Sequence, residues 1–294
     1  MKEKILIVGV SGMLGNALFI ELSKNYEVYG TVRSNEEKKF FTQKEAERIV
    51  GFVDIENMDS LARVFIKVKP DVVLNAVGLI KQNPTINDTS VAIYMNAMFP
   101  HLLADMCKLA GARMIHFSTD CVFSGNKGDI YKENDFSDAE DVYGKTKFLG
   151  EVSYNHCVTI RTSIIGHGLE AHASLVDWFL TQKAEIQGYT KVMYSGFPTV
   201  EIARIIGEYI IPNKKIKGLY QVSAEPISKY DLLKLIAKVY GKKIEIKPSD
   251  TPVNDRSLDS TKFRRISGYE PPAWPALIKK MHEYYKTNKN FIQF

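Results

Sequence analysis

Residues 5–22 read Ile-Leu-Ile-Val-Gly-Val-Ser-Gly-Met-Leu-Gly-Asn-Ala-Leu-Phe-Ile-Glu-Leu, with glycines at positions 9, 12 and 15. The apolar run at 5–8 is typical of a buried strand, and the pattern from Ala17 to Leu22 is typical of a helix. A glycine turn between a first strand and a first helix is where a dinucleotide pyrophosphate rests on helix amides. The stretch therefore predicts a β-turn-α unit that binds a dinucleotide. The alternative is an ordinary glycine turn, because the spacing is GxxGxxG and not GxGxxG.

Short apolar strands continue to alternate with amphipathic helices along the chain. Further strands are expected at 26–32, 49–53, 71–77, 112–118, 158–162 and 218–223, and helices at 58–68, 91–109, 142–154, 175–180, 229–240 and 274–285. Pro100 is expected to bend the helix at 91–109. This alternation forms a parallel sheet covered on both faces. The predicted fold class is α/β: a Rossmann-type doubly wound parallel sheet with a smaller, interleaved C-terminal substrate domain.

The alternation weakens after Arg161, where we expect a second domain to begin. Residues 218–223 nevertheless have the pattern of one more buried strand, so the chain is expected to return to the sheet. The predicted dinucleotide-binding domain is therefore 1–163 plus about 197–223. The predicted substrate-binding domain is about 164–196 plus 224–294.

The composition is that of an ordinary globular protein, because 45% of the 294 residues are hydrophobic and 25% are charged. The longest apolar runs are too short to span a membrane, and the first strand starts too early for a signal peptide. We therefore expect a cytoplasmic protein with no membrane partner. Three scattered cysteines do not form a disulfide framework. The histidines lack the spaced carboxylates or cysteines of a metal site, so no metal is expected.

The net charge of +5 is unevenly distributed along the chain. Residues 211–294 hold 17 Lys/Arg and 8 Asp/Glu, or +9, which leaves −4 for residues 1–210. Basic segments can bind nucleic acid, but no nucleic-acid motif accompanies these lysines. A phosphate-bearing small substrate fits the basic segment at least as well, and we expect no nucleic-acid partner.

The second strand ends Tyr29-Gly-Thr-Val-Arg33-Ser34, without the acid that binds the ribose 2′-hydroxyl of NAD. An arginine at this place suits a 2′-phosphate, because its planar guanidinium offers several donors. NADP(H) is therefore favoured over NAD(H). The alternative is that Arg33 is a solvated loop charge.

Tyr143 and Lys147 are four residues apart and fall on one face of the helix expected there. A nearby ammonium and a nicotinamide cation favour a phenolate and are expected to lower the phenol pKa, so that Tyr143 can act as a general acid. A surface Tyr-Lys pair is the alternative. Thr119 follows the strand 112–118 and places a hydroxyl at the same sheet edge, where α/β proteins bind ligands.

Taken together, these residues resemble the extended short-chain dehydrogenase/reductase family, and within it the dTDP-4-dehydrorhamnose reductase group. The resemblance rests on 9–15, Asn-Ala-Val-Gly at 75–78, Phe-Ser-Thr-Asp-Cys-Val-Phe-Ser-Gly at 117–125, Val-Tyr-Gly-Lys-Thr-Lys at 142–147 with Gly-Glu at 150–151, Arg-Thr-Ser at 161–163, and 256–263. It implies Thr119, Tyr143 and Lys147 as the catalytic triad, with Lys147 also holding the nicotinamide ribose. Asn96 is implied to support that lysine through water.

The turn, Arg33 and the resemblance together give a set of candidate cofactor residues. They are Gly9, Ser11, Gly12, Met13, Leu14, Gly15, Arg33, Asp54, Ile55, Asn75, Ala76, Val77, Gly78, Asn96, Tyr143 and Lys147. The candidate substrate residues are Thr119, Asp120, Cys121, Tyr143, Trp178 and Arg256. For Trp178 the alternative is helix packing. For Arg256, a candidate diphosphate ligand, it is a surface ion pair with Asp255 or Asp259.

Two departures from the family pattern concern the substrate. Cys121 stands where the reductases carry tyrosine, and Ile164-Ile165-Gly166 replaces a Trp-Val-Tyr type of sequence. The resemblance thus implies NADPH-dependent reduction of the 4-keto group of a nucleotide-activated 6-deoxy sugar in cell-surface polysaccharide precursor synthesis, and it leaves a homodimer open. Two alternatives stay open: a UDP-linked keto-sugar reductase or epimerase, and a non-catalytic NADP-binding subunit like the regulatory subunit of methionine adenosyltransferase.

Overall fold

The computed structural model describes residues 2–169 and 174–288 and confirms the predicted α/β fold. Its centre is a seven-stranded sheet in the order β11-β6-β5-β4-β1-β2-β3, with every neighbouring pair parallel. The strands are β1 (Lys4–Val8), β2 (Glu27–Thr31), β3 (Ile49–Val50), β4 (Val72–Asn75), β5 (Arg113–Ser118), β6 (Cys157–Arg161) and β11 (Gly218–Gln221). The strand order reverses between β1 and β4. Doubly wound sheets bind ligands at such a switch point, outside the carboxyl ends of the strands.

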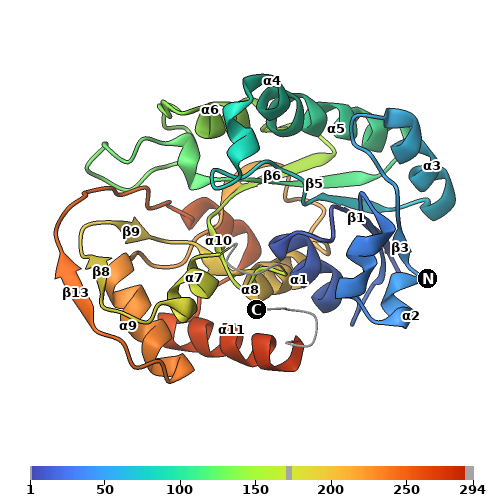
Figure 1. Ribbon diagram of the computed structural model, residues 1–294. Helices are drawn as coiled ribbons and strands as arrows, with labels where there is room; N and C mark the ends of the chain where they lie inside the picture. Colours follow the sequence, from blue (N-terminus) through green and yellow to red (C-terminus); the bar gives the residue numbers. More distant parts are fainter. Residues whose placement is uncertain (1, 170–173, 289–294) are drawn as a thin grey trace.

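Helices cover both faces of this sheet (Figure 1). The α-helices are α1 (Met13–Leu22), α2 (Gln43–Ala46), α3 (Met58–Val68), α4 (Thr89–Ala92), α5 (Phe99–Leu109), α6 (Val142–Leu149), α7 (Leu175–Thr181), α8 (Thr199–Ile205), α9 (Lys229–Tyr240), α10 (Thr261–Ser267) and α11 (Trp274–Asn288). Ile5 and Ile7 of β1 share a core with α1, α8 and α11, whereas Leu6 and Val8 share one with α3 and α5. Side chains alternate along a strand, so each face of the sheet has its own hydrophobic core.

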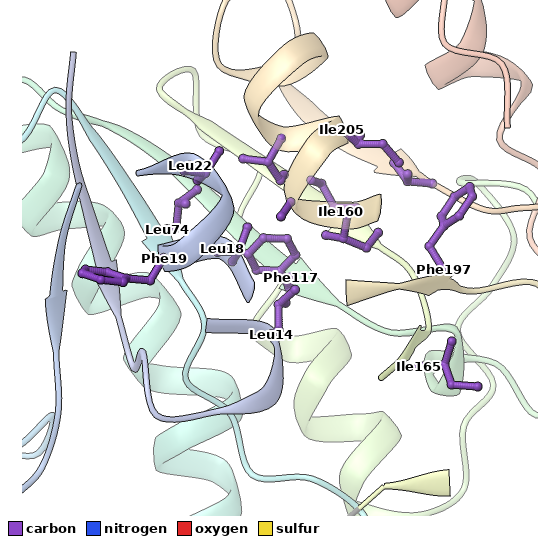
Figure 2. Close-up of a cluster of buried hydrophobic side chains, with 14 of the residues drawn as sticks. Leu14, Leu18, Phe19, Leu22, Leu74, Phe117, Ile160, Ile165, Phe197 and Ile205 are labelled. Carbon is purple, nitrogen blue, oxygen red and sulfur yellow. The ribbon is translucent and has the colours of Figure 1, made fainter. Parts of the chain in front are cut away.

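The core on the α1 side joins the two halves of the chain. Figure 2 shows Leu14 and Leu18 of α1 near Phe117 and Ile160, which belong to the sheet strands β5 and β6. The same buried cluster continues into α7 and α9. The C-terminal half therefore packs on the seven-stranded sheet and shares its main hydrophobic core.

Outside the main sheet, the C-terminal half contains three two-stranded sheets. They pair β7 (Ile164–Ile165) with β10 (Phe197–Pro198), β9 (Met193–Tyr194) with β12 (Ile227–Ser228), and β8 (Ile186–Tyr189) with β13 (Ile246–Ser249). None of these strands was predicted, because two to four residues are too few for a recognisable alternation. Within the described part of the chain, no helix combines the length and apolarity needed to cross a membrane.

Several predicted elements differ in extent from the observed ones, and for three of them the local structure shows the difference clearly. The strand expected at 49–53 ends at Val50, because Phe52 has a left-handed φ of +58°. The helix expected at 142–154 ends at Leu149. There the chain turns at Gly150, where a Cβ would lie 1.9 Å from the Asn96 carbonyl oxygen. The helix expected at 91–109 is α4 and α5 joined by the π-helical turn η3 (Ile93–Met98), with Pro100 in the first turn of α5.

The return of the chain to the sheet is visible at β11, which pairs with the edge strand β6. Before it, α8 packs on α1, although no helix was predicted there. The domain boundaries at 163, 197 and 223 stay a prediction.

Candidate active site

The glycine turn leads from β1 into α1 at the switch point of the sheet. Gly9 has φ +89°, and a Cβ at Gly15 would lie 2.1 Å from the Gly9 carbonyl oxygen. The tight turn therefore requires glycine at both positions. Gly12 differs, because it is exposed and caps α1 without a side chain, and a Cβ there would lie 3.8 Å from the Gly9 carbonyl oxygen. The first turn of α1 carries no acid. Its amides thus form a site suited to an anion.

The other residues of the turn are either half-buried or part of the hydrophobic core. Ser11 and Met13 are half-buried beside the turn. The Leu14 side chain lies in the hydrophobic core, so Leu14 can offer a cofactor only its main chain. A Cβ on Gly9 would lie 2.7 Å from Cγ2 of Val77. The turn after β1 and the segment after β4 are therefore in direct contact.

The segment after β4 lies between the glycine turn and Lys147. Asn75 is buried, its amide nitrogen lies 3.1 Å from Nδ1 of His116, and its Oδ1 accepts a 3.1 Å bond from the Val77 amide. Ala76 is half-buried and Gly78 is exposed. A Cβ on Gly78 would lie 3.7 Å from Nζ of Lys147. Gly78 therefore leaves room beside the ammonium.

Asn96 connects this segment to the catalytic helix. Its Oδ1 accepts from the Leu79 amide at 2.8 Å, and its Nδ2 donates to the Leu79 carbonyl at 3.0 Å and to Thr146 Oγ1 at 3.3 Å. Asn96 thus fixes the chain after Gly78 and the helix α6 that carries Lys147. The role implied for it, support of Lys147 through water, stays a prediction.

The candidates for the adenosine end lie on two exposed loops. Arg33 follows β2 with its side chain 84% exposed, and its Nε is 3.7 Å from Oε1 of Glu37. Asp54 is exposed and caps its own turn by accepting from the Glu56 amide at 2.9 Å. The carbonyl of Ile55 accepts from the Tyr94 hydroxyl. A carboxylate therefore does lie near the end of β2, although it comes from Glu37 and not from the strand itself.

Lys147 is buried at the carboxyl edge of the sheet. It is 6% exposed, and its Nζ donates to the Phe117 carbonyl of β5 at 2.7 Å. Burial lowers the pKa of Lys147 to about 8, and the charge of Glu151 opposes this shift. The ammonium is thus held in place by the strand that leads to Thr119.

Tyr143 and Thr119 face each other at this edge. Thr119 is buried, and its hydroxyl donates to Asp120 Oδ1 at 3.1 Å. Burial, together with the neighbouring Cys121, raises the pKa of Tyr143, and the Thr119 hydroxyl lowers it only in part. The expected lowering by Lys147 is not found, because desolvation of the phenol dominates and the ammonium is directed at Phe117. Tyr143 is therefore a neutral proton donor.

A pocket of about 220 Å³ adjoins these residues on the substrate side. It is lined by Cys121, Phe123, Ser124, Asn126, Ala139, Glu140, Asp141 and Arg256. Arg256 reaches Cys121, with Nη1 at 3.6 Å from Sγ, and its buried Nε has no partner among the described residues. Burial and then Asp120 raise the pKa of Cys121 to about 11, against the charge of Arg256. The predicted residues Cys121 and Arg256 are thus brought together next to Asp120.

The alternative assigned to Arg256 does not fit its surroundings. None of the ion pairs among residues 2–169 and 174–288 includes Arg256. Asp255 and Asp259 instead accept from the amides of Ser257 and Thr261. Trp178 is 42% exposed on α7, and its carbonyl accepts bonds from Thr181 and Gln182. Its part in substrate binding stays a prediction.

Two polar residues near the site received no role from the sequence. Glu151, which the sequence marked only as part of the Gly-Glu match at 150–151, accepts from Ser118 and from Arg161 at 2.7 Å each, which ties the end of β5 to the end of β6. Tyr194 of β9 has a buried hydroxyl without a partner among the described residues. The surroundings of both residues come from segments that are distant in the sequence, so no local pattern predicts them.

A larger pocket, about 280 Å³, lies at the opposite edge of the sheet. It is lined by Lys108, Gly111, Ala112, Arg113, Asn155, His156, Lys214 and Lys217. The Arg113 guanidinium donates to the carbonyls of Ile210, Ile211, Asn213 and Ile216, after the π-helical turn η5 (Ile206–Ile210). This charge neutralises a helix C-terminus. Ligands of doubly wound sheets bind at the other edge, so the smaller pocket is the candidate site.

Comparisons with known proteins agree with this architecture. The family model described as RmlD substrate binding domain matches residues 2–287. The dTDP-4-dehydrorhamnose reductase of Aggregatibacter actinomycetemcomitans is 27% identical and covers 96% of this chain and 99% of its own. Methionine adenosyltransferase 2 subunit beta of Xenopus tropicalis is 24% identical over 95% of this chain and 89% of its own. The solved dTDP-4-dehydrorhamnose reductase of Bacillus anthracis, in complex with NADP, has a TM-score of 0.81 at 22% identity, covering 97% and 100% of the two chains.

Proposed function

The chain belongs to the RmlD substrate binding domain family, and from this premise we propose that it catalyses the NADPH-dependent reduction of the 4-keto group of a nucleotide-activated 6-deoxy sugar. The product would enter the synthesis of cell-surface polysaccharide precursors. One observation carries the proposal: Thr119, Tyr143 and Lys147 lie at the carboxyl edge of the sheet, and the segment 77–78 that adjoins Lys147 also contacts the glycine turn. The similar reductase from Aggregatibacter actinomycetemcomitans supports the same reaction class.

The residues at the switch point fit a nicotinamide dinucleotide. The uncapped amides at Gly12 would hold the pyrophosphate, and the space that Gly78 leaves beside Lys147 would take the nicotinamide ribose. Arg33 would hold the 2′-phosphate of NADPH. When bound, NADPH supplies the hydride for the reduction. The bound NADP of the Bacillus anthracis structure supports this cofactor.

The chain's own residues supply the proton and the positioning. The Tyr143 phenol donates its proton to the carbonyl oxygen of the sugar as negative charge develops there. The Thr119 hydroxyl orients the same oxygen, because it lies beside the phenol. Lys147 holds the ribose and keeps a positive charge next to the reacting oxygen. Hydrogen bonds from Asn96 to Thr146 and from Lys147 to the Phe117 carbonyl hold α6 and Lys147 in the positions that these roles require.

The regulatory alternative is kept open by one observation, the likeness to methionine adenosyltransferase 2 subunit beta over 95% of the chain. A regulatory subunit that binds NADP can retain Thr119, Tyr143 and Lys147, so the presence of these residues does not separate the two functions. Turnover separates the two functions, since fold alone does not decide function.

Purified protein should oxidise NADPH in the presence of at least one dTDP- or UDP-linked 4-keto sugar, measured as loss of nicotinamide absorbance. Tyr143→Phe should lower kcat by roughly 10²- to 10⁴-fold, because the proton donor is lost. NADPH affinity should stay nearly the same. Tyr29→Phe is the matched control, since the Tyr29 hydroxyl donates to Glu27 on β2. Tight NADPH binding without turnover of any keto sugar would instead support the regulatory alternative.

A further inference from the structure

Tyr194 of β9 has a phenol oxygen that is buried but has no hydrogen-bond partner among the described residues. A Cβ built on Gly196 would lie 2.5 Å from this oxygen and 2.2 Å from the Ser163 carbonyl oxygen. The hydroxyl therefore lies against the backbone where the chain has just left β6 and is about to enter α8. This backbone lies between the sheet and the C-terminal half, at the carboxyl edge that carries Thr119.

An unpaired buried hydroxyl is unusual, because burial removes its bonds to water without replacing them. Tyr284 of α11 also has a buried hydroxyl without a partner among the described residues, but the charges that act on it are Glu21 and Glu45, which do not belong to the carboxyl edge. Other buried phenols have partners. The Tyr269 hydroxyl donates to Glu201 at 2.9 Å, and the Tyr131 hydroxyl accepts from the amides of Gly125 and Lys127. Binding sites are the places where such a group gains its partner from a ligand.

The charges around Tyr194 indicate which kind of ligand group its phenol would bind. Burial, and then the negative charge of Asp120, raise the pKa of Tyr194 well above that of a free phenol, so the group is a permanent donor. Asp120, whose negative charge acts on this phenol, directly follows Thr119 in the chain. A phosphate would accept from Tyr194 but would be repelled by the Asp120 carboxylate. A neutral hydroxyl suits both, because it accepts one bond and donates another.

We infer that Tyr194 is a sugar-recognition residue, whose phenol donates a hydrogen bond to a ring hydroxyl of the nucleotide sugar while that hydroxyl donates to the Asp120 carboxylate. The inference rests on the proposed function, because Thr119 and Tyr143 place the sugar ring next to Asp120. The contact is made away from the reacting carbonyl. It is therefore equally strong in the ground and transition states and contributes to KM more than to kcat.

The test compares Tyr194→Phe with wild type and with Tyr26→Phe. Tyr26 is the matched control, because its phenol has a partner, the Gly207 carbonyl at 2.7 Å, far from the site. In Tyr194→Phe the KM for the keto sugar should rise about tenfold, because one hydrogen bond to the sugar is lost. The kcat should stay within roughly twofold of wild type. Calorimetry with dTDP or UDP alone should give unchanged affinity, since neither carries the keto-sugar ring that Tyr194 is proposed to bind.

Thermal unfolding without ligand adds a readout that needs no substrate. Tyr26→Phe should lower Tm by roughly 2 °C, whereas Tyr194→Phe should not lower it, because no protein bond is lost. A lower Tm with unchanged KM in Tyr194→Phe would mean that the hydroxyl has a structural partner such as water, which overturns the inference. Unchanged KM and Tm overturn it as well. If wild type reduces none of the sugars, the proposed function fails, whereas turnover with an insensitive Tyr194→Phe refutes only the role of Tyr194.

Discussion

The burial of Lys147 has a consequence for stability that can be measured without any ligand. Its pKa is about 8 in the folded chain and ordinarily 10.5. Below pH 8 both states carry the proton, and the folded state bears the full cost of the buried charge. Between pH 8 and 10.5 the unfolded state binds more protons, so this group makes the free energy of unfolding rise with pH.

We expect Lys147→Met to remove this rise and to be more stable than wild type at pH 7 by on the order of 2 kcal/mol. Urea unfolding between pH 7 and 10 measures the difference, with Lys145→Met as the exposed control on the same helix. A difference between wild type and Lys147→Met that stays constant from pH 8 to 10 would show that burial does not shift this lysine.

Two opposite charges lie beside β2, where we propose that NADPH is distinguished from NADH. The Arg33 guanidinium lies 3.7 Å from Glu37, whose other oxygen accepts from the Arg33 amide at 3.3 Å. We expect Arg33→Ala to lower the affinity for NADPH about tenfold while NADH is unaffected, because only NADPH has the 2′-phosphate. Glu37→Gln should raise the preference for NADPH, since it removes a carboxylate that repels the phosphate. Fluorescence titration of both cofactors checks this, and equal affinity of wild type for the two would contradict it.

At this scale the sequence predicted what local spacing encodes. Tyr143 and Lys147 were expected on one face of a helix because they are four residues apart. Both lie on α6, and Lys147 contacts β5. Glu37 and Tyr194 were missed. The significance of Glu37 depends on the fold of a loop. That of Tyr194 depends on the charge of Asp120, 74 residues earlier in the chain, and no local pattern records either.

Among the elements, the junction of β1 and α1 separates a structural glycine from a binding glycine. A methyl group on Gly15 would lie 2.1 Å from the Gly9 carbonyl oxygen, whereas one on Gly12 would lie 3.8 Å from the same oxygen, an ordinary van der Waals contact. We expect Gly15→Ala to lower the free energy of unfolding by about 2–3 kcal/mol. Gly12→Ala should keep it within about 0.5 kcal/mol and yet weaken NADPH binding about tenfold, because the methyl occupies the place of the pyrophosphate. Urea unfolding and cofactor titration of both variants test this, and a Gly12→Ala protein with wild-type affinity would exclude the pyrophosphate from this turn.

The long elements were predictable and the short ones were not. Helix α3 begins and ends where the sequence predicted, at Met58 and Val68, because an Asn57 cap and a regular apolar stripe define it. The paired strands β7 and β10 have two residues each, and tertiary pairing rather than pattern creates them. The π-helical turn η3 was equally hidden, since it alters hydrogen bonding without altering composition.

Over the whole molecule, residues 254–260 connect the C-terminal half to the catalytic edge. The Tyr131 amide donates to Ser257, and the Ser223 hydroxyl donates to the Leu258 carbonyl. The sequence anticipated an interleaved chain through β11, but it could not show that both halves share one core. Arg256 lies in this connecting segment. Its position therefore depends on both halves at once.

The charge of Arg256 is balanced by the acidic wall of the pocket. Against the opposing effect of burial, hydrogen bonds from Ser124 hold the pKa of Asp138 below its ordinary range, and those from Gly144 and Lys81 do the same for Asp141. The charge of Arg256 adds a smaller lowering of both pKa values. A diphosphate that binds here must overcome these carboxylates, and Arg256 is the pocket residue that can do so with a planar pair of donors. Removing it would lose the contact and also leave the carboxylates facing the anion.

We therefore expect Arg256→Ala to raise the KM for the nucleotide sugar more than tenfold and to leave kcat and NADPH affinity nearly unchanged, because the contact lies away from the reacting carbonyl. The KM of Arg256→Lys should lie between those of wild type and Arg256→Ala, since lysine keeps the positive charge but lacks the planar pair of donors. Arg265→Ala is the control, an exposed arginine of α10 in the same basic part of the chain. Calorimetry with dTDP or UDP alone should show the same loss of affinity as the KM. If nucleotide affinity is unchanged in Arg256→Ala, the guanidinium serves only as a counter-ion for Asp138 and Asp141, and the diphosphate binds to another cation.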